Sequence, residues 1–192
     1  MTVPLRAALH TFVSMITFPG SIVHAFTRQL FCRMMGVPVY ETVYFAVDDP
    51  SKYVKRDVLP PGKTFALICL GWLFDVLLGW LLLAPVSLTM FAFGFPGLFT
   101  HSDQWTALPN LLLVWVGFSV LMHSFPSREE LQELRGRVLG NKEAPAILRV
   151  LAAPFYLVMG IAVWGNVVLL DAFFSVGMML LLPGVARALF PL

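Results

Sequence analysis

Residues 64–93 read TFALICLGWLFDVLLGWLLLAPVSLTMFAF, and this stretch decides the class of fold. Asp75 is its only charged residue, and about 20 apolar residues suffice for a helix to cross the hydrocarbon core of a bilayer. The whole chain of 192 residues is 58% hydrophobic and 12% charged, with a mean hydropathy of +0.81. Soluble domains are typically about 25% charged. In water this chain would expose large apolar patches, so the sequence predicts a mainly α integral membrane protein.

Three further stretches, 7–35, 108–124 and 146–190, are apolar enough for membrane helices. The first is interrupted or kinked at Phe18-Pro19-Gly20, because proline and glycine break helices. The third forms either one long helix or two shorter ones, since polar residues and a proline interrupt it. We therefore expect a polytopic helical protein with four to five membrane helices. The interrupting residues are Asn166, Asp171 and Pro183.

Residues 37–58 differ from the rest of the chain. Valine and aromatic residues, which favour strands, stand on both sides of the turn signal Asp48-Asp49-Pro50-Ser51. We expect a short β-hairpin near 37–58. The length of the chain leaves room for one membrane domain, residues 1–192, without a separate soluble module.

The distribution of lysine and arginine predicts the orientation in the membrane. The connections 46–63 and 126–149 are basic, whereas 94–107 has no lysine or arginine. Cytoplasmic connections carry the basic residues, so the two basic connections should lie in the cytoplasm. This places His24 and His123 near the same cytoplasmic leaflet. The net charge of +2, without a basic run, gives no indication of nucleic-acid binding.

The segment His24-Ala25-Phe26-Thr27-Arg28 has the spacing of a metalloprotease motif. In H-E-x-x-H, two histidines four apart share one helix face and bind zinc, and the glutamate is the general base. Here Ala25 stands at the glutamate position and Arg28 at the second histidine position. Alanine cannot accept a proton, and arginine is not a zinc ligand. A buried histidine beside an arginine that reaches the membrane surface is the structural alternative.

Asp75 lies 11 residues into the long apolar stretch, about 16 Å along a helix and near the middle of the bilayer. A charge there costs about 2.5–3.5 kcal/mol, so we expect Asp75 to face a partner group, a cavity or a metal.

Ser127 and Glu130 have the S-x-x-E spacing of a helix capping box. His123 ends the apolar stretch just before them, where packing gives a histidine no advantage.

These residues together resemble the bacterial zincin membrane peptidase family, small relatives or analogues of the site-2 proteases. Residues 18–37 resemble its F-P-G-x-x-x-H-E-x-x-H-x-L-F-C-x-x-x-G pattern, and 122–130 are similar to its M-H-x-F-P-S-x-x-D pattern. Residues 71–79 resemble G-P-x-x-x-N-x-x-x-G more loosely, with Trp72 for the proline and Asp75 for the asparagine. The resemblance covers about residues 1–135, and the helical part from about 146 to 192 lies outside it.

The resemblance implies a membrane-embedded zinc site that opens to the cytoplasm, in a bacterial cytoplasmic membrane, and cleavage of a peptide or membrane-protein substrate. It makes His24 a metal ligand, with His123 and Glu130 as candidates to complete the site. Ala25 replaces the catalytic glutamate, so peptidase activity should be weak or absent. Asp75 would lie where the family has an orienting amide. Pairing of Arg28 with Glu130 or Asp75 would instead leave an ion pair in place of the metal.

Three hypotheses for the function follow from the sequence. The first is a zincin-like metalloprotease homologue that binds metal with little or no peptidase activity. The second is a non-enzymatic membrane scaffold that keeps the fold and binds a partner. The third, a small transporter or channel, rests only on the polar residues Asp75, Asn166 and Asp171.

Overall fold

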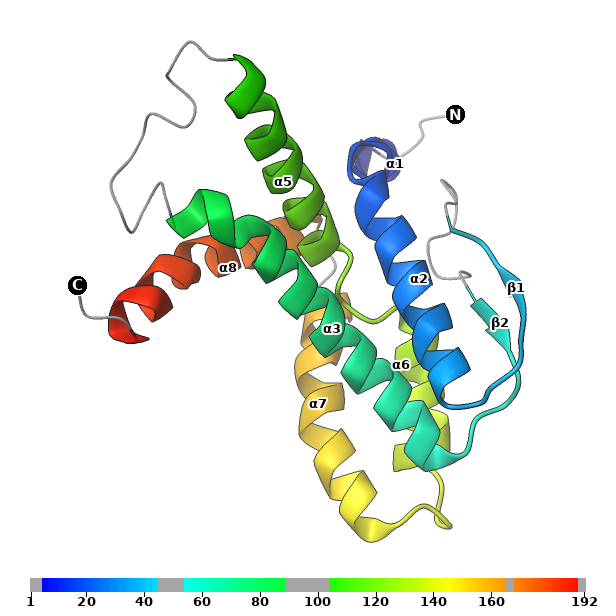
Figure 1. The fold of residues 1–192 in the computed structure, drawn as a ribbon. Helices are drawn as coiled ribbons and strands as arrows, with labels where there is room; N and C mark the ends of the chain where they lie inside the picture. Colours follow the sequence, from blue (N-terminus) through cyan, green and yellow to red (C-terminus); the bar gives the residue numbers. More distant parts are fainter. Residues whose placement is uncertain (1–4, 45–53, 89–103, 165–167, 190–192) are drawn as a thin grey trace.

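The computed structural model describes residues 5–44, 54–88, 104–164 and 168–189, and shows a mainly helical chain with one pair of strands (Figure 1). Helix α3 runs through the middle, with α2 and the strands on one side and α7 on the other. The elements are α1 (Leu5–Ile16), α2 (Phe18–Met34), β1 (Val39–Thr42), β2 (Val54–Arg56), α3 (Pro61–Ser87), α5 (Gln104–Met122), α6 (Arg128–Leu134), the π-helical turn η2 (Arg135–Leu139), α7 (Ala146–Trp164) and α8 (Val168–Leu189).

The predicted interruption of the first apolar stretch is confirmed, because α1 ends at Ile16 and α2 begins at Phe18. Two side chains of α5 bind the backbone groups at this break. Trp115 Nε1 donates to the carbonyl of Ile16 at 2.9 Å, and Ser119 Oγ donates to the carbonyl of Thr17 at 2.6 Å. Ser119 Oγ also accepts from the N–H of Gly20 at 2.7 Å. The backbone groups at the break are therefore hydrogen-bonded inside the protein.

Helix α3 buries three polar side chains among its apolar core residues and exposes large apolar side chains on its other face. The exposed face of a helix in a soluble protein typically has polar and charged side chains instead. Two helices, Pro61–Ser87 and Ala146–Val163 of α7, are long and apolar enough to cross a membrane, and Leu108–Met122 and Leu170–Ala186 are shorter apolar helices. The buried polar residues of α3 are Thr64, Asp75 and Ser87, and the exposed apolar ones are Leu70, Leu73, Phe74, Leu77 and Leu81.

Helix α3 also binds the carbonyl groups of α8 next to Pro183. A proline inside a helix leaves the carbonyl four residues before it without its N–H partner. Here that carbonyl belongs to Met179, and Ser87 Oγ donates to it at 2.6 Å. Trp80 Nε1 donates to the neighbouring carbonyl of Met178 at 2.8 Å. The two donors are seven residues apart, two turns of α3, so they lie on one face.

The strands β1 and β2 pair antiparallel, within the segment where we expected a hairpin, with an irregularity between Val39 and Glu41. The turn signal at 48–51 lies outside the described residues. Tyr40 Oη donates to Asp57 Oδ1 at 2.7 Å and ties the strand pair together at its exposed surface. In Figure 1 the strands lie against the outer side of α2, away from α7.

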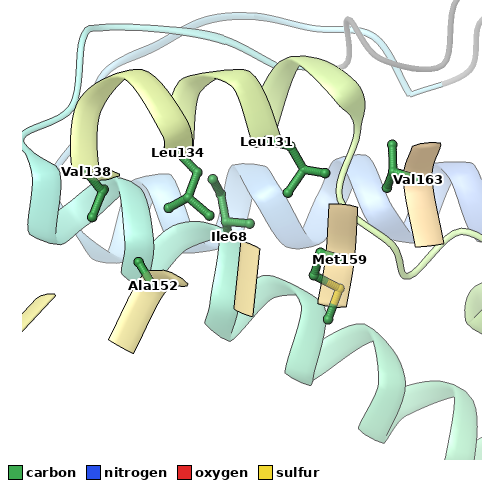
Figure 2. Close-up of a cluster of buried hydrophobic side chains, with 7 residues drawn as sticks. All are labelled: Ile68, Leu131, Leu134, Val138, Ala152, Met159 and Val163. Carbon is green, nitrogen blue, oxygen red and sulfur yellow. The ribbon is translucent and has the colours of Figure 1, made fainter. Parts of the chain in front are cut away.

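The polar connection after α5 is folded, and the apolar stretch 146–190 forms two helices, α7 and α8. Asn166 lies outside the described residues. In Figure 2, side chains of α6 and η2 point toward Ile68 of α3 and toward α7, so this connection packs onto the bundle. This packing holds α6 against α3. The cluster consists of Ile68, Leu131, Leu134, Val138, Ala152, Met159 and Val163.

Candidate functional site

His24 and Asp75 meet between α2 and α3, near the middle of both helices. His24 Nδ1 lies 3.0 Å from Asp75 Oδ2, and only 1% of Asp75 is exposed. Thr27 Oγ1 donates to the other carboxylate oxygen at 2.7 Å. Thr27 is three residues after His24, so it shares the same helix face. The expectation that Asp75 faces a partner is confirmed.

Arg28 pairs with Glu130, which α6 brings against α2. Arg28 Nε lies 2.7 Å from Glu130 Oε1, and Arg28 Nη2 donates to Oε2 at 3.3 Å. Arg28 Nη1 donates to the carbonyl of Leu67 in α3 at 3.3 Å. The arginine is 3% exposed. Two carboxylate oxygens facing one guanidinium form the strongest type of protein ion pair, and here it joins α2, α3 and α6.

Gly71 makes room for this arginine. A Cβ atom built on Gly71 would overlap Arg28 Nη1 and lie 2.8 Å from Arg28 Cζ. Any side chain at residue 71 must therefore displace the guanidinium. Gly71 also lies one turn before Asp75 on the buried face of α3. The Arg28–Glu130 pair and the His24–Asp75 pair are therefore neighbours along this helix.

Glu130 is held from a second direction by the start of its own helix. Its N–H donates to Ser127 Oγ, and its Oε2 accepts from the N–H of Ser127, both at 3.1 Å. The predicted capping box is confirmed. The carboxylate thus caps α6 and binds Arg28 at the same time, which fixes its position and uses its acceptor sites.

His123 lies at the end of α5 and faces α2 one turn before His24. Its Nδ1 is 3.0 Å from the carbonyl oxygen of Ser119, and a Cβ atom on Gly20 would lie 2.8 Å from the same nitrogen. Gly20 is four residues before His24, hence on the same face of α2. The structure therefore places His123 beside the helix that carries His24.

His24, His123 and Glu130 are the side chains that a zinc ion at this site would need. No group of three His, Cys, Asp or Glu side chains in the described part of the chain could hold a metal ion. Glu130 is engaged by Arg28 and by its capping box, and Ala25 is fully buried without an acceptor group. The residues as arranged do not fit a three-ligand zinc centre, because the guanidinium already supplies the cation that Glu130 binds.

Thr27, Gly71, Ser119 and the carbonyl of Leu67 were not identified from the sequence. The spacing of Thr27 from His24 could have indicated it, because residues three apart share a helix face. Ser119 and Leu67 act through contacts between distant segments, which no local pattern reveals.

Comparison with known proteins adds no further residue, since no family model, no curated protein and no solved structure matches the chain.

Proposed function

We propose that this chain is a multi-pass membrane protein in which a buried ion pair has replaced the zinc centre of a zincin-like fold, and that it acts by holding a membrane partner rather than by cleaving peptides. The contact between Arg28 and Glu130 carries the proposal. Arg28 stands at the second ligand position of the motif and binds the acidic residue that a zinc site would need. Without a base at Ala25, a general-base contribution of about 10²–10⁴-fold is also missing.

The energetics of the pair support a structural role. Removing one partner from a buried ion pair costs about 3–5 kcal/mol, because the other charge stays buried without compensation. Arg28 joins three elements, α2, α3 and α6, through Glu130 and the carbonyl of Leu67. A metal that binds several helices would hold them together in the same way. The fold can therefore persist with a guanidinium in that position.

The membrane part of the proposal rests on the distribution of side chains. Large apolar side chains are exposed along α3, three of its polar side chains are buried among its apolar core residues, and most residues of the apolar stretch of α7 are not buried. We propose four or five spans, drawn from the α1–α2 region, α3, α5, α7 and α8. The basic segments before α3 and between α5 and α7 then lie in the cytoplasm of a bacterial cell, with the site near that leaflet.

A zinc site remains the second candidate, and one observation favours it. Both histidines have Nδ1 next to an oxygen, Asp75 Oδ2 for His24 and the Ser119 carbonyl for His123. A metal-binding imidazole is usually held in this way, so that Nε2 can face the metal. In this reading the two histidines bind zinc and Arg28 weakens the site by charge repulsion.

Two measurements separate the candidates. Metal analysis of the purified chain should find zinc well below one equivalent, and the content should not change in His24→Ala or His123→Ala. Zinc near one equivalent that falls in both variants would support the metal site and contradict the ion-pair proposal. Purification from membranes should recover one defined partner protein that chelator does not release. The absence of such a partner, or its loss on chelation, would refute the scaffold role.

A further inference from the structure

The turn between η2 and α7 collects basic side chains at one end of the bundle. We call residues 135–149 the basic turn, and its cations are Arg135, Arg137, Lys142 and Arg149. Arg137 is neutralised locally, because its Nε lies 3.2 Å from Glu133 Oε1 and its Nη1 donates to the carbonyl of Leu59 at 3.4 Å. The sequence of the turn has one acidic residue, Glu143, for the other three cations. The basic turn therefore has an excess of positive charge.

Among the cations of the basic turn that the structure describes, Arg149 is the one with a buried donor nitrogen that makes no hydrogen bond. Its Nε is buried and has no hydrogen-bond partner among the described residues. A guanidinium cannot give up its proton, so its donors must be satisfied by an acceptor. Arg149 also lies in the first turn of α7, which contains no acidic residue. A helix N-terminus carries a partial positive charge, so both groups favour an anion at this place.

The neighbours of Arg149 indicate what kind of anion it is. Ile147 and Val150 are 73% and 71% exposed, and Leu151 is 56% exposed. Cations next to exposed aliphatic side chains match the boundary between lipid headgroups and acyl chains. An acidic protein segment would satisfy the charge but would leave these aliphatic side chains in water. The same segment of α7 thus needs an anion and an apolar phase.

We infer that the basic turn binds the phosphate of an anionic phospholipid headgroup, with Arg149 as the principal donor and Arg135 and Lys142 as the flanking charges. Basic pockets at the cytoplasmic ends of membrane helices bind such headgroups. The inference rests on the membrane part of the proposed function and does not depend on the Arg28–Glu130 pair. Because metal analysis does not test it, the failure of one proposal leaves the other standing.

The test measures lipid affinity of the purified full chain in neutral detergent. Phosphatidylglycerol is titrated against phosphatidylcholine, and bound lipid is counted by native mass spectrometry. We expect preference for phosphatidylglycerol, about fivefold weaker binding for Arg149→Gln or Lys142→Gln, and tighter binding for Glu143→Gln. Arg33→Gln is the matched control, because Arg33 is an exposed cation at the end of α2 and outside the basic turn. It should change the affinity by less than twofold.

Several outcomes would overturn the inference. Equal affinity for the two lipids, or an equal loss in Arg33→Gln and Lys142→Gln, would show that the basic turn is not a specific site. Inorganic phosphate that displaces the lipid at equal ionic strength would indicate a site for the free anion. Poly-glutamate that competes with the same strength would indicate an acidic protein partner. Lys142 is exposed, so its variant should fold and keeps the test valid if Arg149→Gln does not.

Discussion

Replacing Gly71 by alanine tests whether the Arg28–Glu130 pair holds the bundle together. The added Cβ would overlap Arg28 Nη1, and it is fixed to the backbone of α3, so the guanidinium must move. Moving it away from Glu130 leaves a buried charge without compensation, at a cost of about 3–5 kcal/mol. Alanine in a helix gains roughly 0.5–1 kcal/mol over glycine. The net loss of unfolding free energy should therefore be about 2–4 kcal/mol.

The assay is reversible unfolding of the purified chain in mixed micelles with increasing dodecyl sulfate, followed by helical circular dichroism. Gly160→Ala is the matched control, because Gly160 lies inside α7 and a Cβ there meets nothing within 4 Å. This control should be neutral or slightly stabilising. In a background in which Arg28→Met and Glu130→Gln remove both charges, Gly71→Ala should cost clearly less, since no guanidinium pair is left to break. Equal effects of Gly71→Ala with and without the pair would refute the reasoning.

Three further predictions follow from the contacts of α3 and of the strand pair. Ser87→Ala should lower the unfolding free energy by about 1–3 kcal/mol in the same micelle assay, because the carbonyl of Met179 loses its donor. Asp75→Ala should be more destabilising than Asp75→Asn, which keeps an acceptor oxygen; equal losses would contradict the bonds to Asp75. The hydrogen bond to Asp57 raises the pKa of Tyr40 above its usual 10.0. The bond therefore stabilises the fold fully below pH 10.0, and this stabilisation is lost as the pH rises through the raised pKa of Tyr40. Asp57→Asn should lower this pKa in an ultraviolet titration of the tyrosines.

Local patterns predicted the parts of the structure that depend on neighbouring residues. The break just before Phe18-Pro19-Gly20 follows from backbone chemistry, and the capping box of Ser127 and Glu130 follows from a spacing of three. Each of these features is decided within about one helical turn.

The pairing of the buried charges could not be read from the sequence. His24 and Arg28 share a helix face, and Asp75 and Glu130 were both possible partners for Arg28. The spatial order of α2, α3 and α6 decides the matter, since Glu130 caps α6 opposite Arg28 while Asp75 faces His24 and Thr27. The guanidinium of Arg28 fits between α2 and α3 because Gly71 has no side chain. A pattern of residue types does not report which backbones approach so closely.

Converting the site into a zincin-like metal centre should need two substitutions at once, because each single change leaves a charge without its partner. Ala25→Glu adds a carboxylate at a fully buried position three residues from Arg28, where it competes with Glu130 for one guanidinium. Arg28→His removes the cation and leaves the carboxylate of Glu130 partly buried in the protein.

Only the double variant has both histidines and the glutamate of the motif, and it lacks the guanidinium that repels a dication. We expect each single variant to unfold more easily than the native chain whether or not zinc is present. The double variant should be stabilised by zinc and destabilised again by a chelator. Stabilisation of the native chain by zinc to the same extent would contradict the ion-pair proposal, because Arg28 would then not occupy the place of the metal.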